Sequence, residues 1–218
     1  MTLMPLEPLV EYKYKNVTIS GLPGGGSTTL LNELREGLKF DGWTGFSGGE
    51  FMRAYAAEKG LFDASKKLHH DATVYSDDFD RQVDMGIREK LELENHWIIE
   101  SWLSGFLAQQ VPGVLKVLVI CSEFSVRVDR IVNRDGITVD EAKHHLHDRY
   151  RTNLEKWSRM YRSEWDKWVV GAGKATHEEP IDFWKSELYD IVIDTYPTNQ
   201  QQGLELVLHA LQQKNHQD

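Results

Sequence analysis

A run of glycines between two apolar segments of different period constrains this chain more than any other feature. Residues 16–20 form a short β-branched segment, and the sequence Gly21-Leu22-Pro23-Gly24-Gly25-Gly26-Ser27-Thr28 follows at once. Leucines then recur from residue 29 to residue 38 at the spacing of one helix face. The pattern predicts a strand, a tight loop and a helix in direct succession.

The composition of this loop is typical of phosphate binding. Glycines allow successive backbone N–H groups to turn inward, and the N-terminus of the next helix favours negative charge. Gly21 and Gly26 have the spacing of the pattern G-x-x-x-x-G-K-[ST], with Thr28 at the position of the Mg²⁺-binding hydroxyl and Ser27 at that of the lysine. The residues expected to hold nucleotide phosphates are Gly21, Gly24, Gly25, Gly26, Ser27, Thr28 and Thr29.

Two other interpretations of the loop stay open on these residues. The glycines can form a turn that binds nothing. Gly24 and Gly26 also resemble the beginning of G-x-G-x-x-G, but the third glycine would fall at Thr29 and no strand-end acid follows about 20 residues later. The missing lysine is a separate matter, because electrostatic stabilisation is most of what phosphoryl-transfer enzymes supply. Activity then requires an arginine or lysine from elsewhere in the chain.

The rest of the sequence alternates between strand and helix patterns. Continuous apolar runs at 97–100 and 115–121 are typical of strands covered on both faces of a parallel sheet. Shorter strands are expected at 43–46 and 189–194, and helices at 50–59, 65–94, 125–161 and 203–212. The helical stretch breaks at Asp135-Gly136, where Thr138 and Glu141 can form a capping box. This alternation predicts an α/β fold of three layers, a parallel sheet of about five strands with helices on both faces.

One segment, residues 169–185, lacks a clear period and carries Gly171, Gly173 and Pro180. It is predicted to be an insertion or a mobile flap. The chain as a whole is predicted to be one domain over residues 1–218, because its length suits a single core.

Charge and composition exclude several classes of function. A formal net charge of −9 argues against a broad nucleic-acid surface, which would need clustered Lys and Arg. The longest apolar run is far shorter than the roughly 20 residues that cross a bilayer, and the N-terminus lacks a secretory pattern. Cys121 is the single cysteine, as suits a reducing compartment. We expect a cytoplasmic protein with no membrane or nucleic-acid partner, and a monomer is favoured.

Candidate polar residues follow several predicted strands. The glycine loop follows the first strand, Glu100 and Trp102 follow the apolar run at 97–99, and Asp194 ends the last strand. The carboxyl ends of parallel strands share one edge, which is where ligands bind in such sheets. Asp194 has an alternative role, since it can cap the turn before Pro197.

Six segments, taken in order, add a family resemblance. They are the strand and loop Val17–Gly24, the serine, glycine and arginine element Ser47–Arg53, the acidic helix motif Asp80–Asp84, the strand and turn Ile98–Gly105, the arginine-rich segment Arg127–Ala142 and the last strand Tyr189–Thr195. Together they resemble the cytidylate kinases, in particular the short archaeal-type group of nucleoside monophosphate kinases in the P-loop NTPase superfamily. The resemblance extends from Val17 to about Leu211.

The resemblance implies transfer of the γ-phosphoryl group of ATP to CMP or dCMP, with Mg²⁺ held partly by Thr28. It implies an acceptor-binding helical insertion over about 48–95 and a lid region with an insertion over about 127–187. Catalytic roles fall on Glu100, Arg130 and Arg134. The residues implied at the acceptor are Ser47, Gly49, Arg53, Asp80, Trp102, Arg149 and Asp194.

Because the sequence departs from the family pattern at two positions, alternative functions stay open. Ser27 replaces the lysine in a degenerate form of the loop, and Trp102 stands where the family usually has an arginine. Both changes remove a charge that would face phosphate. The alternatives are a catalytically weak or inactive homologue that binds nucleotides, and a P-loop kinase for a different small-molecule acceptor.

Overall fold

A computed structural model describes residues 11–59 and 72–212, and these form one parallel sheet of five strands in the order β2-β3-β1-β4-β5. The strands are β1 (Asn16–Gly21), β2 (Thr44–Ser47), β3 (Trp97–Glu100), β4 (Val114–Ile120) and β5 (Ile191–Asp194). The predicted α/β fold is confirmed, with 97–100 and 115–120 on the strands that flank β1. The order changes direction beside β1, so the loop that follows this strand opens at the point where ligands bind in open α/β sheets.

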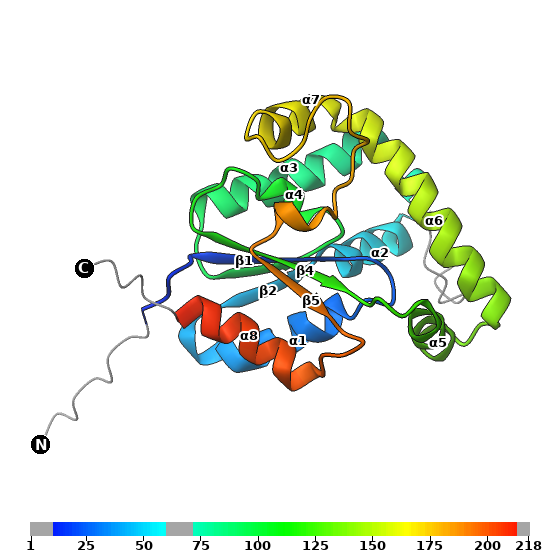
Figure 1. Ribbon diagram of the computed structural model, residues 1–218, viewed down its shortest axis with the longest axis horizontal. Helices are drawn as coiled ribbons and strands as arrows, with labels where there is room; N and C mark the ends of the chain where they lie inside the picture. Colours follow the sequence, from blue (N-terminus) through cyan, green and yellow to red (C-terminus); the bar gives the residue numbers. More distant parts are fainter. Residues whose placement is uncertain (1–10, 60–71, 213–218) are drawn as a thin grey trace, which may run out of the picture.

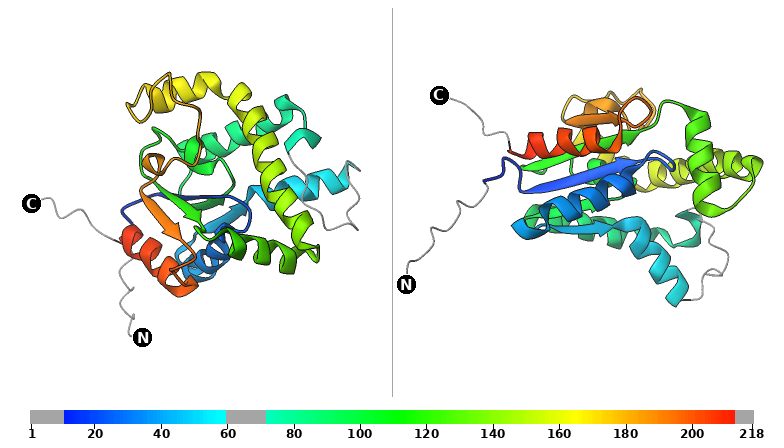
Figure 2. Two further views of the ribbon diagram at one scale, coloured as in Figure 1. Left: turned by 45° about the vertical axis from the view of Figure 1, so that its right-hand side comes forward. Right: turned by 90° about the horizontal axis from the view of Figure 1, so that it is seen from below.

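Helices cover both faces of the sheet (Figure 1). They are α1 (Ser27–Leu38), α2 (Gly48–Glu58), α3 (Asp77–Leu93), α4 (Ser104–Leu107), α5 (Phe124–Asp135), α6 (Val139–Met160), α7 (Arg162–Trp165) and α8 (Gln200–Gln212). Figure 1 shows α1 and α8 on one side of the sheet and α3 and α4 on the other, and both views of Figure 2 keep α5 and α6 beyond the carboxyl ends of the strands. In the described parts of the chain, no helix is long and apolar enough to span a membrane.

Each face of the sheet has its own apolar core. The leucines of α1 pack with Val17 and Ile19 of β1 and with Val207 of α8. On the other face β1 presents buried polar side chains, and the short helix α4 lies against them. The Ser20 hydroxyl accepts a hydrogen bond from the Gly105 N–H at 2.8 Å, while the Ser104 hydroxyl donates to the Ile19 carbonyl at 3.0 Å. Close approach of α4 therefore satisfies groups that burial would otherwise leave unpaired.

Residues 169–185 do not form a flap, because this segment belongs to the second core. That the segment is an insertion stays a prediction. Phe183 is fully buried with its ring 4.8 Å from that of Phe106, and Trp184 donates from Nε1 to the Trp102 carbonyl at 3.0 Å. Its anchors are aromatic rings at irregular intervals rather than a periodic face. The spacing of apolar residues along the sequence therefore gives no indication of this packing.

Helix boundaries agree with most of the predicted segments. The break after Asp135 is confirmed, since Gly136 has a φ of 68° and Thr138 and Glu141 form the predicted capping box of α6. Of the predicted helix at 65–94, the structure confirms α3 and places a 3₁₀ turn at Ala72–Val74. Residues 65–71 lie outside the described part of the chain.

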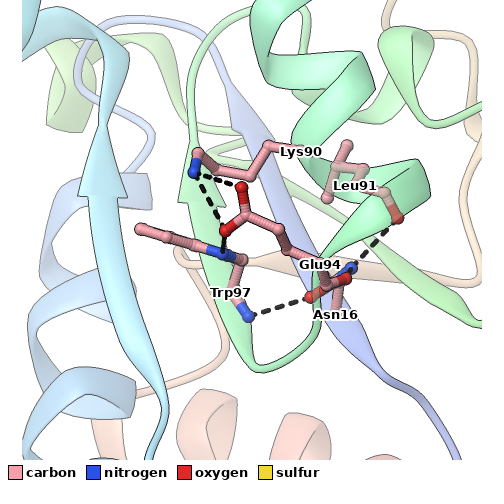
Figure 3. A network of polar contacts seen from close by, with 5 residues as sticks. All are labelled: Asn16, Lys90, Leu91, Glu94 and Trp97. Carbon is pink, nitrogen blue, oxygen red and sulfur yellow. Dashed lines mark hydrogen bonds and ion pairs between the residues drawn. The ribbon is translucent and has the colours of Figure 1, made fainter.

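A polar network fixes the start of β3 (Figure 3). The Asn16 side chain donates to the carbonyls of Leu91 and Glu94 at 3.1 and 2.8 Å and accepts from the Trp97 N–H at 2.9 Å. The Glu94 carboxylate accepts from Lys90 and from the Trp97 indole. Because Asn16 begins β1, this network sets the register of β3 against β1 and so determines where Glu100 ends the strand.

Candidate active site

The glycine loop has a conformation that glycines alone adopt without strain. Gly24 and Gly26 have φ angles of 77° and 106°, in the left-handed region. A Cβ atom at Gly24 would also lie 2.9 Å from the carbonyl oxygen of Arg127. The loop is thus packed closely against α5, and its shape is a property of the backbone.

Arg130 of α5 holds this loop from one side. Its Nη1 donates to the Gly24 and Gly25 carbonyls at 3.0 and 3.4 Å and to the Thr195 hydroxyl at 2.7 Å. The neighbouring Arg127 donates from Nε to the Pro23 carbonyl at 3.1 Å, and burial lowers the pKa of its guanidinium. Because C=O and N–H of one trans peptide point in opposite directions, the N–H of Gly26 points away from Arg130.

A large cavity of about 890 Å³ opens in front of the loop and the start of α1. Thr28 and Thr29 are exposed there, whereas Ser27 is buried. The first N–H groups of a helix have no partner within the helix, so this end of α1 suits an anion. Arg134 also lines the cavity, and its guanidinium makes a two-pronged ion pair with Asp135, with N–O distances of 2.7 and 2.8 Å.

A small cavity of about 120 Å³ adjoins the large one beneath α6. Five residues line both cavities: Gly49, Arg53, Ser101, Trp102 and Arg149. Arg53 comes from α2 and Arg149 from α6, so two guanidinium groups from separate helices meet at the junction. The Arg149 guanidinium lies 5.1 Å from the centre of the Trp102 ring, a cation–π contact that orients it.

The small cavity contains two carboxyl groups one helical turn apart on α3. Asp80 is 5% exposed; its Oδ2 lies 2.8 Å from the Lys156 ammonium, and its Oδ1 has no hydrogen-bond partner among the described residues. Burial raises the pKa of Asp80, and the Lys156 ammonium acts in the opposite direction. Burial also raises the pKa of Asp84 to about 7, although the Tyr161 hydroxyl donates to its Oδ2 at 2.6 Å. The cavity thus offers a carboxylate oxygen to a ligand that can donate a hydrogen bond.

Glu100 lies between the loop and α2. Its Oε1 accepts from the Ser27 hydroxyl and its Oε2 from the Ser47 hydroxyl, each at 2.8 Å. Burial raises the pKa of Glu100, while the two serine hydrogen bonds and the nearby Arg53 charge lower it. A buried carboxylate therefore connects the glycine loop and α1 to the start of α2.

Known proteins share this arrangement of loop, sheet and helices. Residues 17–144 match the sequence model of a family described as AAA domain. A cytidylate kinase of Methanosarcina barkeri is 30% identical over 198 residues, which cover 89% of this chain and 95% of the relative. The chain belongs to the cytidylate kinase family.

Further similarities are consistent with the family. A second cytidylate kinase, from Methanopyrus kandleri, is 30% identical over 190 residues and covers 82% of this chain and 83% of the relative. A crystal structure of a gluconokinase from Sinorhizobium meliloti has a TM-score of 0.51 at 15% identity, with 91% of each chain covered. The similarity to the gluconokinase concerns the fold alone.

Most residues predicted for the site of this cytidylate kinase homologue lie together. Gly21, Gly24, Gly26, Ser27, Thr28, Thr29, Glu100, Arg130 and Arg134 line the large cavity, as do Ser47, Gly49, Arg53, Trp102 and Arg149, and Asp80 lines the small one. Gly25 is buried and is not among the described lining residues of either cavity, and neither is Asp194. Its Oδ1 accepts from the N–H groups of Ser122 and Tyr196 at 2.9 and 3.1 Å, so it caps the turn, and Thr195 faces the large cavity instead.

Two polar lining residues of the small cavity, Tyr75 and Asn153, did not emerge from the sequence as site residues. Neither did Lys156, which pairs with the lining residue Asp80. Lys156 donates to the Tyr75 carbonyl at 2.8 Å as well as pairing with Asp80. The sequence does contain one indication of Lys156 as a site residue: it lies seven residues after Arg149, so both side chains lie on one face of a helix. Asp80 does not pair with the neighbouring Arg81, because Arg81 pairs with Glu164.

The donor set suits magnesium only together with phosphates. Within residues 11–59 and 72–212, no group of three His, Cys, Asp or Glu side chains could hold a metal. The Thr28 hydroxyl is exposed at the start of α1, and Mg²⁺ is commonly bound by few protein oxygens, waters and substrate phosphates. The residues present therefore fit a magnesium ion that arrives with a nucleotide.

Proposed function

We propose that the protein transfers the γ-phosphoryl group of ATP to a nucleoside monophosphate, CMP or dCMP. One observation carries the proposal: the large and small cavities meet at Arg53 and Arg149. A nucleoside monophosphate with its base in the small cavity would place its phosphate at this junction, facing the large cavity. Two guanidinium groups there suit an anion that must be both oriented and neutralised.

The large cavity supports the donor side of the proposal. Backbone N–H groups of the loop and of the first turn of α1 can cradle phosphate oxygens, and Thr28 is the expected protein ligand of Mg²⁺. A Mg²⁺ ion held there would neutralise part of the charge on the donor phosphates. Arg130 fixes the loop, and Arg134 at the far side of the cavity is the predicted contact for the transferring group.

The small cavity favours cytosine as the acceptor base. The unpartnered Oδ1 of Asp80 can accept a hydrogen bond from an exocyclic amino group, which cytosine carries at its 4-position. Uracil has a carbonyl oxygen at the same place, and two acceptors facing each other in a buried site are unfavourable. This argument supports CMP and dCMP over UMP.

The test is production of ADP from ATP and Mg²⁺ with a panel of nucleoside monophosphates. We expect turnover with CMP and dCMP and little with UMP, AMP or GMP. Arg53→Ala should abolish most of the turnover, while Lys143→Ala, which removes an exposed cation on α6, should leave it unchanged. Absence of turnover with every acceptor would contradict the proposal.

One observation favours a second candidate, a homologue that binds nucleotides without efficient transfer. Ser27 occupies the lysine position, and its hydroxyl donates to Glu100. The cations among the described lining residues of that cavity are the four arginines Arg53, Arg130, Arg134 and Arg149. Calorimetric binding of ATP with no ADP formed by any acceptor would support this candidate over the first.

A further inference from the structure

Glu100 occupies a special place in the sheet. It ends β3, which lies between β1 and β2, and it pairs in register with Ile19 on one side and Ser47 on the other. The chain leaves β1 into the phosphate loop and leaves β2 into α2. The side chain of Glu100 therefore stands where the donor-side and acceptor-side elements separate.

The hydrogen bonds of Glu100 connect these two elements. Ser27 is the first residue of α1, and Ser47 is the N-cap of α2, where its hydroxyl also accepts from the Glu50 N–H at 3.3 Å. Both serines are buried and both donate to Glu100. One carboxylate thus joins the N-terminal ends of two helices, α1 and α2.

The bridge changes the role expected for Ser27. A hydroxyl has a single hydrogen to donate, and that of Ser27 is used on Glu100. Ser27 therefore does not present its donor to a phosphate in the large cavity. At the position where a P-loop carries its lysine, this chain carries a group that holds the loop in place.

We propose that Glu100 is a positioning residue that holds the phosphate loop and α2 at a fixed separation through Ser27 and Ser47. The proposal rests on the proposed phosphoryl transfer. Arg53 lies on α2 less than two turns after Ser47, so the same bridge sets the position of Arg53 relative to the loop. Reacting groups must come within about 3–3.5 Å of each other, and a displacement near 1 Å can cost about 100-fold in rate.

Two substitutions separate positioning from a chemical role for the Glu100 charge. Glu100→Gln keeps one acceptor and supplies one donor, and a serine hydroxyl can accept from it, so both links can survive. Glu100→Ala removes both links. A group that acts as a base or that holds a metal-bound water needs the carboxylate, so for such a role the two variants would be equally damaging.

The experiment compares kcat and the KM values for ATP and CMP in these variants. We expect Glu100→Gln to keep kcat within about 5-fold of the unmodified protein and Glu100→Ala to lose about 10–100-fold, with both KM values within about 3-fold. Ser27→Ala and Ser47→Ala should each lower kcat by about 5–10-fold, and the double variant should lose less than the product of the two. Ser163→Ala, an exposed serine on α7, is the matched control.

Each outcome decides between the possibilities. If Glu100→Gln is as impaired in kcat as Glu100→Ala while the unmodified protein turns over, the positioning proposal is wrong and the charge itself is required. A loss confined to the KM for ATP would also overturn it. If the unmodified protein has no turnover with any acceptor, the proposed function fails and this proposal fails with it.

Discussion

The two cavities that meet at Arg53 and Arg149 are constructed by different means. The large cavity is shaped by a backbone loop whose glycines adopt left-handed angles, and Arg130 holds it by hydrogen bonds to main-chain carbonyls. The small cavity is shaped by side chains, with Asp80 and Lys156 forming an ion pair that is buried on both partners. Backbone groups recognise what all nucleoside triphosphates share, whereas side chains can distinguish one base from another.

This contrast predicts different sensitivities to substitution. Changes at the junction should reduce turnover with every acceptor. Changes to the side chains of the small cavity should alter stability and the choice of acceptor while the loop continues to bind ATP.

The largest effect is expected at the junction. Arg149→Ala removes a guanidinium that lines both cavities, and turnover with CMP should fall by about 100- to 1000-fold, because charge stabilisation dominates phosphoryl transfer. The ATP dissociation constant should change by less than about 5-fold. Steady-state kinetics and calorimetry measure the two quantities, and Lys143→Ala on the same helix is the control. A selective loss of ATP affinity would place Arg149 on the donor side instead.

The next effect concerns stability. Lys156→Met removes the ammonium that lies 2.8 Å from Asp80 and leaves a buried carboxylate without a counter-charge. The free energy of unfolding at neutral pH should fall by about 3 kcal/mol, measured by urea denaturation. Lys143→Met is exposed and should change it by less than about 0.5 kcal/mol. Equal free energies of unfolding for Lys156→Met and Lys143→Met would show that the Asp80–Lys156 pair contributes nothing to stability.

A smaller effect is expected on the choice of base. In Asp80→Asn the amide oxygen can keep the contact with Lys156, which directs the NH₂ group into the small cavity. A donor then faces the base, so the ratio of kcat/KM for CMP over UMP should fall by about 10- to 100-fold. Asp78→Asn, exposed on the same helix, should leave the ratio unchanged. An unchanged ratio in Asp80→Asn would remove Asp80 from base recognition.

The smallest effect is a dependence of stability on pH. The pKa of Asp84 is raised from 3.8 to about 7, so the folded protein binds more protons than the unfolded chain between these values. Its stability should therefore decrease as the pH rises from about 4 to 7. Asp84→Asn removes this contribution and should gain stability relative to the unmodified protein across that window, by about 1–2 kcal/mol in thermal unfolding at several pH values. A constant difference between the two would contradict the raised pKa.

Local signals in the sequence were sufficient for much of the fold. The β-branched run, the glycines and the leucine spacing identified β1, the loop and α1, and the capping box at Thr138 located the start of α6. The same local logic placed Glu100 at the carboxyl edge of the sheet, whereas the site arginines were expected from the family resemblance. These features depend on neighbours within one or two helical turns.

The remaining features depend on contacts between distant segments. The bond from Ser27 to Glu100 joins residues 73 positions apart, and the pairing of Asp80 with Lys156 joins α3 to α6. Neither has a signature in the spacing of residues. The choice between the two roles left open for Asp194 had a related cause, because the direction of a side chain at a strand end depends on the turn that follows it.

Helix α6 contributes to both cavities, since Arg149 and Lys156 are two turns apart on one uninterrupted helix, a separation of about 10 Å. A rigid rod moves both of its ends together. A translation of α6 as a rigid body would displace Arg149 and Lys156 together, so the junction of the cavities and the buried ion pair with Asp80 are coupled through one helix.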